Sequence, residues 1–192
     1  MAKEKPAGHI VLFFAILIFG VTADLITKAV VFRWLGAPSP LGPNQPYWVW
    51  QGILGTRFGF ETSLNEGALF GFGQGFWIVF AVASVVASLI VLGWIFFYGA
   101  IRDRLLTIAL SCILAGILGN LYDRLGLSGL RWNFPNSLHE DGGPVHAVRD
   151  WILVMLGSYH WPNFNIADSL LVCGASLLIF HAFYHPIASL ET

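Results

Sequence analysis

Ionisable and amide side chains lie inside or directly beside long apolar segments of this chain. In chain order, they are Asp24, Lys28, Asn65, Asn120, Asp123, Arg124, Asp150, Asn165 and Asp168. Such groups are costly in an apolar environment and usually mark a function. Carboxylates are the main reactive groups in the set. Two aspartates that share one proton can activate water and hydrogen-bond a carbonyl group, which is the chemistry of aspartic peptidases.

Other site chemistries find little support in the sequence. Cys112 and Cys173 lie far apart, each within an apolar run, and are interpreted as small buried hydrophobic residues. The six histidines are scattered, without an HExxH or CxxC motif, so neither a metal nor another cofactor is expected. A net charge of −1 without a cluster of Lys and Arg removes the electrostatic basis for binding nucleic acid.

Most of these polar groups also have a purely structural explanation. Asp24 and Lys28 have the i,i+4 spacing of an ion pair on one helix face. Asn165 and Asp168 have the spacing of the N-cap and N3 residues of a capping box, and Asp150 is placed to cap a short helix. A turn, an interhelical hydrogen bond and a helix-dipole interaction would account for Asn65, Asn120 and Arg124. Their convergence at one membrane depth favours a functional site.

The composition predicts an α-helical integral membrane protein. Hydrophobic residues make up 56% of the chain and charged residues 11%, whereas an ordinary soluble domain has about 25% charged residues. A helix needs roughly 20 apolar residues to cross a bilayer. Four windows meet this requirement, at about 10–32, 76–98, 105–122 and 166–185. We predict one membrane domain over residues 1–192.

Basic residues near the span ends predict the orientation. Lys3 and Lys5 precede the first span, and Arg102 and Arg104 lie in the short turn after the second. Such residues prefer the cytoplasm, so both termini are predicted to be cytoplasmic and the two long loops extracytoplasmic. A cleaved signal peptide is the alternative for the first span, but apolar character continues beyond its small-residue site.

The two long loops differ in their predicted structure. After several prolines, the segment 33–75 has short aromatic and β-branched runs separated by glycine, which indicate two or three short strands on the outer membrane surface. The segment 124–165 is rich in Gly and Pro, and a short helix is predicted at about Val148 to Leu156. Residues 125–149 are expected to form a surface extension, and trimming 128–143 is expected to leave a folded protein with altered substrate preference.

With these motifs, the chain resembles the lipoprotein signal peptidases (signal peptidase II), which are bacterial membrane aspartic endopeptidases. Five elements occur in the order typical of that family and cover most of the chain. They are Asp24-x-x-Thr27-Lys28, Asn65-x-Gly67-Ala68-x-Phe70, Gly119-Asn120-x-x-Asp123-Arg124, a Val-x-Asp-aromatic element ending at Asp150-Trp151, and Phe164-Asn165-Ile166-Ala167-Asp168-Ser169.

The resemblance implies that Asp150 and Asp168 are the catalytic pair and that the other polar residues support the pair or bind substrate. It further implies a monomer in the bacterial inner membrane, surrounded by lipid. This enzyme would cut a prolipoprotein before its diacylglyceryl-modified cysteine, with a small sheet cradling the substrate. Four features depart from the family pattern: Arg149, Trp151, the long segment 125–149 and the long loop before Asn65.

Two other functions remain open on the sequence. The first is a small transporter or proton-conducting protein, in which Asp24, Lys28, Asp123 and Asp168 form a relay. Transporters of this kind often contain internal repeats and broken spans, and neither is evident in the sequence. The second is an inactive relative that only binds lipoproteins, against which the intact Asp150 and Asp168 argue.

Overall fold

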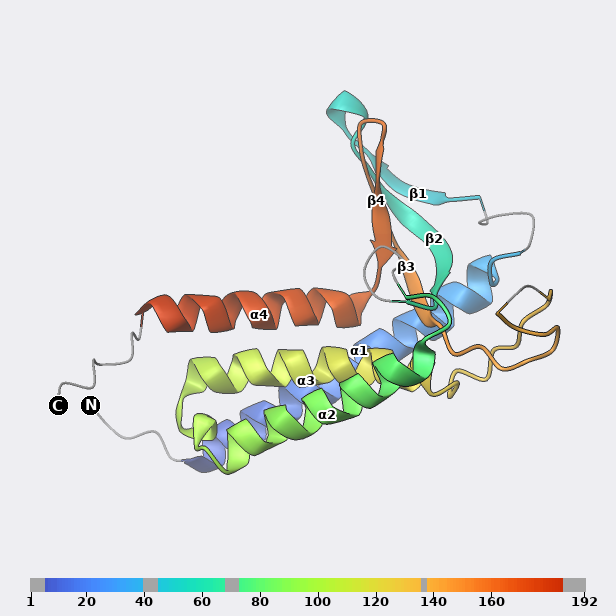
Figure 1. Cartoon of the computed structure of the whole chain (residues 1–192). Coiled ribbons are helices and arrows are strands. Elements are labelled where there is room, and N and C mark those ends of the chain that lie inside the picture. Colours follow the sequence, from blue (N-terminus) through green and yellow to red (C-terminus); the bar gives the residue numbers. More distant parts are fainter. Residues whose placement is uncertain (1–5, 40–44, 68–72, 136–137, 185–192) are drawn as a thin grey trace.

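The fold consists of a helix bundle with a small sheet standing at one end (Figure 1). The computed structural model describes residues 6–39, 45–67, 73–135 and 138–184. Within these ranges, four helices are long and apolar enough to cross a membrane, which confirms the predicted fold class. They are α1 (Pro6–Leu35), α2 (Trp77–Phe96), α3 (Arg104–Arg124) and α4 (Ile166–Tyr184).

The predicted spans differ from these helices only at their ends. The first helix extends beyond the expected 10–32 in both directions, and α2 is shorter than the expected 76–98. The last residue of the expected fourth span, His185, lies outside the described residues. A short 3-10 helix, Ala100–Arg102, joins α2 to α3 at the end of the bundle away from the sheet (Figure 1).

The helices are apolar on the outside and carry polar groups inside the bundle. Large hydrophobic side chains such as Val11, Phe19, Leu89 and Val172 are exposed on α1, α2 and α4. The central helix α3 instead buries polar side chains, namely Thr107, Ser111, Asn120 and Asp123. This distribution suits a bundle surrounded by lipid, because lipid solvates the apolar faces and the polar groups find partners within the protein.

Two glycines let α3 approach its neighbours closely. A Cβ atom at Gly119 would come within 2.5 Å of Asp24 Oδ2 and 3.1 Å of Ala167 Cβ, and one at Gly116 would collide with the carbonyl oxygen of Ala167. Small residues at such positions allow helix backbones to pack tightly in membranes. As a result, polar residues of α1, α3 and α4 meet at the sheet end of the bundle.

The sheet contains strands from both long loops. Within the described residues it has four antiparallel strands in the order β1 (Tyr47–Gln51), β2 (Arg57–Asn65), β3 (Val148–Leu156) and β4 (Tyr159–Phe164). The pairing of β2 with β3 places Ser63 opposite Asp150 and Asn65 opposite Val148. The sheet predicted in the first loop is therefore present, but half of it comes from the second loop.

The helix predicted at Val148 to Leu156 is wrong, because this segment is the strand β3. Its run VRDWILVML is almost continuously apolar, and periodicity alone does not separate a buried strand from a helix in such a run. Pairing on both sides, with β2 and β4, satisfies its backbone and determines the outcome. The structural role suggested for Asp150, as the cap of that helix, is removed by the same finding.

Two small apolar clusters support the sheet end. Val31 and Phe32 of α1 pack with Trp151 and Ile152 of β3, so the unusual Trp151 anchors the sheet on the bundle. In the segment 125–149, Trp132 is buried with Val145 and Ala147. The expected surface extension is thus partly wrong, because Trp132 within it is buried. Folding of the chain without residues 128–143 stays a prediction.

Candidate active site

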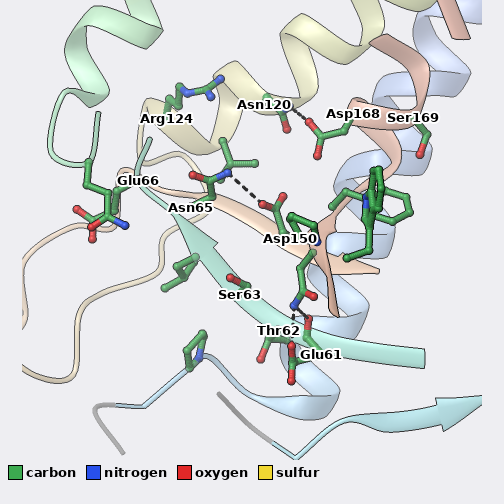
Figure 2. A pocket seen from close by; sticks show the side chains of 18 of the residues that line it. Glu61, Thr62, Ser63, Asn65, Glu66, Asn120, Arg124, Asp150, Asp168 and Ser169 are labelled. Atoms are coloured by element: carbon green, nitrogen blue, oxygen red, sulfur yellow. Dashed lines mark hydrogen bonds between the residues drawn. The ribbon is translucent and has the colours of Figure 1, made fainter. Parts of the chain in front are cut away.

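The two predicted catalytic aspartates lie close together where the sheet meets the bundle (Figure 2). Asp150 belongs to β3, and Asp168 lies in the first turn of α4. Asn165 donates a hydrogen bond from Nδ2 to Asp150 Oδ1 at 2.6 Å, and Asn65 Nδ2 lies 3.4 Å from Asp150 Oδ2. Both oxygens of the Asp150 carboxyl group are thereby oriented by amide side chains from other parts of the chain.

Asp168 is held by the start of its own helix and by α3. Its Oδ2 accepts a hydrogen bond from the backbone N–H of Asn165 (3.1 Å), and its own N–H donates to Asn165 Oδ1 (3.0 Å). This reciprocal pair confirms the predicted capping box. Asn120 Nδ2 donates to Asp168 Oδ1 at 2.8 Å. The structural and functional explanations are therefore compatible, because capping fixes the position of the carboxylate.

The two aspartates have different electrostatic environments. Burial, followed by the negative charge of Asp168, raises the pKa of Asp150 to about 8, although hydrogen bonds from Asn165 and Asn65 oppose the shift. Asp150 therefore carries a proton at neutral pH. Asp168 lies at the N-terminus of α4, where the helix dipole favours a negative charge. The pair is thus asymmetric, because burial favours the protonated form of Asp150 while Asp168 lies at the start of a helix.

Lys28 joins the supporting residues into one buried network. Its Nζ lies 2.7 Å from Asp24 Oδ2, 3.1 Å from Asp123 Oδ2 and 3.0 Å from Asn120 Oδ1. The side chains of Lys28, Asp24 and Asp123 are completely buried. Asp24 Oδ1 also accepts a hydrogen bond from the N–H of Ala167 at 2.9 Å. The predicted i,i+4 pair is thus real, and it positions both Asn120 and the first turn of α4.

The role of Arg149 in this network was missed from the sequence, where it stood out only as a departure from the family pattern. Arg149 Nε donates to Asp123 Oδ1 at 2.8 Å, and its backbone N–H donates to Asp123 Oδ2 at 3.2 Å. With Arg149, the buried cations balance the two carboxylates of Asp24 and Asp123. The available signal was a charge next to Asp150 in an otherwise apolar run.

A cavity of about 1470 Å³ opens in front of the two aspartates. On the sheet side its wall includes Glu61, Ser63 and Asn163, and between the helices it includes Ile117 and Leu171. Arg124 also lines it, with an Nη2 3.4 Å from the carbonyl oxygen of Gly67. Further lining residues not singled out from the sequence are His160 on β4 and Trp132, Phe134 and His139 in the segment 125–149.

All nine predicted site residues are described, and the structure brings them together at one end of the bundle. Asn65 also accepts a hydrogen bond from the N–H of Gly67 at 3.1 Å, as its structural explanation required. Ala68 and Phe70 of the same motif lie outside the described residues. Within the part of the chain that the structure describes, no group of three or more potential metal ligands occurs.

These contacts do not favour the proton-relay alternative. Asp24, Lys28 and Asp123 are paired with one another at the sheet end. Toward the other end of the bundle, the core contains the apolar side chains of Phe13, Ile95, Leu110 and Leu114. A bundle of membrane-length helices with linked aspartates facing a large cavity instead defines a membrane-embedded hydrolase of the aspartic type.

Comparison with known proteins identifies the family. The model of the family described as signal peptidase (SPase) II matches residues 16–184. The lipoprotein signal peptidase of Rhodopirellula baltica is 45% identical over 179 residues, covering 93% of this chain and 74% of the relative. That of Polynucleobacter necessarius is 34% identical over 170 residues, covering 88% and 86%. The chain belongs to the signal peptidase II family.

The fold is also shared with a solved structure. A bacterial membrane enzyme determined by the in meso method at 2.3 Å resolution matches with a TM-score of 0.72. The match covers 95% of this chain and 94% of that chain at 23% identity. At this level of identity the likeness shows the common fold, including the membrane helices and the sheet.

Proposed function

We propose that this chain is an endopeptidase that removes the signal peptide from diacylglyceryl-modified prolipoproteins, cutting just before the lipidated cysteine. Family membership supports the reaction, and relatives that carry the name lipoprotein signal peptidase support the substrate class. The observation that carries the proposal is the pair Asp150 and Asp168, joined through Asn165 at the edge of a large cavity.

In the proposed mechanism, the two aspartates have opposite roles. Ionised Asp168 takes a proton from a water molecule, and the water oxygen attacks the scissile carbonyl carbon. Protonated Asp150 donates a hydrogen bond to the carbonyl oxygen and stabilises the charge that develops there. The proton is then delivered to the leaving nitrogen, the C–N bond breaks, and the pair again holds one proton.

The cavity offers different surroundings on the two sides of the aspartates. Between the helices its wall includes Ile117, Leu171 and Val172, which suit the apolar signal peptide and the acyl chains. On the sheet side its wall includes Glu61, His160 and Asn163, which suit the polar chain that follows the lipidated cysteine. Asp150 and Asp168 lie between these two parts, where the scissile bond would be placed.

We further propose that the enzyme works as a monomer in the bacterial inner membrane, with its sheet on the extracytoplasmic side. This orientation rests on the basic Arg102 and Arg104 at the opposite end of the bundle. In cells, a membrane-impermeant maleimide is expected to label Asp141→Cys and not Arg102→Cys, with Cys112 and Cys173 replaced by Ala. Both test residues are described, and the reverse labelling pattern would overturn the orientation.

The cleavage reaction itself should depend on lipidation and on the shared proton. Purified protein is expected to cleave a diacylglyceryl-modified precursor peptide and to leave the unmodified peptide intact.

Because the raised pKa of Asp150 is about 8, the proton is present below this pH and lost above it. The rate should therefore fall as the pH rises through about 8.

The variant Asn65→Leu tests the origin of this alkaline limb. The hydrogen bond from Asn65 lowers the pKa of Asp150, so its removal should move the limb to higher pH. The measurement is the initial rate from about pH 6 to about pH 10. Equal cleavage of the unmodified peptide would refute the proposed substrate, and a flat pH profile would refute the shared proton.

A further inference from the structure

A second polar cluster lies on the sheet side of the cavity, apart from the catalytic pair and its supporting network. Glu61 of β2 and Asn163 of β4 meet across the intervening strand β3. Asn163 Nδ2 donates to Glu61 Oε2 at 3.0 Å and to the Glu61 carbonyl oxygen at 3.2 Å. His160 Nε2 lies 3.2 Å from the same Glu61 Oε2. All three residues line the cavity, and Figure 2 shows Glu61 below Asp150.

The strands are irregular where this cluster forms. The pairing of β2 with β3 shifts between Phe60 and Ser63, and that of β3 with β4 shifts between Ile152 and Val154. Glu61 lies within the first irregularity, and Asn163 lies between the residues on β4 that bound the second. Such bulges re-aim side chains and are frequent beside active sites. Two of them on either side of β3 bring Glu61 and Asn163 together.

The cluster presents hydrogen-bond acceptors that the protein does not fully satisfy. The two bonds from Asn163 Nδ2 to Glu61 fix the orientation of the Asn163 amide. Its oxygen, Oδ1, is buried and has no hydrogen-bond partner among the described residues. Glu61 is itself buried and carries a carboxylate. A buried acceptor without a partner is unfavourable, so a ligand group that donates hydrogen bonds would complete this part of the cavity.

On the proposed function, on which this inference rests, the donor comes from the substrate. The signal peptide and acyl chains are apolar and stay at the level of the helices, whereas the mature chain must leave toward water past the sheet. Ser63, two residues after Glu61, pairs with Asp150. With a rise of roughly 3.3 Å per strand residue, Glu61 lies within a few residues of the scissile bond along an extended chain.

We infer that Glu61 and Asn163 form a specificity subsite for the mature segment of the substrate, and that it prefers a basic, hydrogen-bond-donating side chain shortly after the lipidated cysteine. Lys or Arg supplies several donors and a positive charge. An acidic side chain at the same place would face the Glu61 carboxylate and the unpaired Asn163 oxygen. The subsite therefore discriminates by both attraction and repulsion.

The test compares three lipidated precursor peptides that differ only at the second to fourth positions after the cysteine. These positions are Lys in the first peptide, Ser in the second and Glu in the third. The wild-type enzyme is expected to show a kcat/KM about fivefold or more higher for the Lys peptide than for the Glu peptide, which is typical of one charge-assisted contact. In Glu61→Gln this ratio should approach one, while the Ser peptide is still cleaved. Glu140→Gln, an exposed acid in the segment 125–149, is the matched control and should keep the wild-type ratio.

A second variant covers the case in which Glu61→Gln does not fold. His160 has a half-exposed side chain beside Glu61, so His160→Lys places a positive charge there with little disturbance and should also reduce the Lys-to-Glu ratio. An unchanged ratio in both folded variants would overturn the inference. Failure of the wild-type enzyme to cleave any lipidated peptide would instead count against the proposed function itself.

Discussion

Asp150→Asn and Asp168→Asn are each expected to abolish turnover, lowering kcat by at least about a thousandfold. The reason is that, in the proposed mechanism, each substitution removes one of the two roles of the pair, either proton acceptor or proton donor. Groups that act as a unit give non-additive losses, so the double variant should be only slightly worse than either single one. The measurement is single-turnover cleavage of a lipidated precursor by purified variants.

Folding and binding provide the controls for this experiment. Asn is nearly isosteric with Asp and can still accept a hydrogen bond, so thermal stability and substrate affinity should change far less than turnover. Asp141→Asn makes the same chemical change at an exposed position and should leave turnover at the wild-type level. If Asp168 served only as a helix cap, Asp168→Asn would retain near-normal activity, and the catalytic assignment would have to move to Asp123 and Asp24.

Lys28→Met should cause the largest loss of stability among single substitutions in the polar network. The ammonium group is completely buried between Asp24 and Asp123, and its removal leaves those carboxylates without their shared cation. Breaking a buried ion pair in this way costs about 3–5 kcal/mol. The expected result is a fall in the unfolding temperature in detergent on the order of 10 °C.

The matched control for this substitution is Arg33→Met, which removes one positive charge from an exposed position on the same helix. It should leave the unfolding temperature within about 2 °C of the wild type. Adding Asp24→Asn to Lys28→Met should restore part of the loss, because one uncompensated charge disappears. Equal unfolding temperatures for Lys28→Met and the wild type would show that the network does not hold the bundle together.

The membrane helices and the polar cluster could be predicted because both depend on local sequence. Apolar length alone identifies a span, and a charged residue within a span must find a partner inside the protein. The spacing of Asn165 and Asp168 predicted a capping box, which the structure confirms with two reciprocal hydrogen bonds. Catalysis by Asp150 and Asp168 stays a prediction that the variants above will test.

Features that depend on distant pairing could not be predicted in the same way. The strand β3 looks like a short helix until its two neighbours in the sheet are known. Arg149 finds Asp123 only after β3 has docked on α3. The cluster of Glu61 and Asn163 forms because two strand irregularities coincide across β3, and the sequence of neither strand shows this alone.

The sheet also determines when the site can assemble during synthesis. Its two middle strands, β2 and β3, are neighbours in the sheet but are separated along the chain by the membrane helices α2 and α3. The hairpin β1–β2 is translated before α2 and α3, whereas its partner β3 is translated after both. An isolated two-stranded hairpin is marginally stable, so the first hairpin gains lasting support only late in biogenesis. Asn65 can therefore reach Asp150 only after β3 has been translated, and Asn120 can reach Asp168 only after the start of α4 has been translated. The two aspartates and the side chains that hold them thus come together only after both long loops and the start of the last helix have been translated.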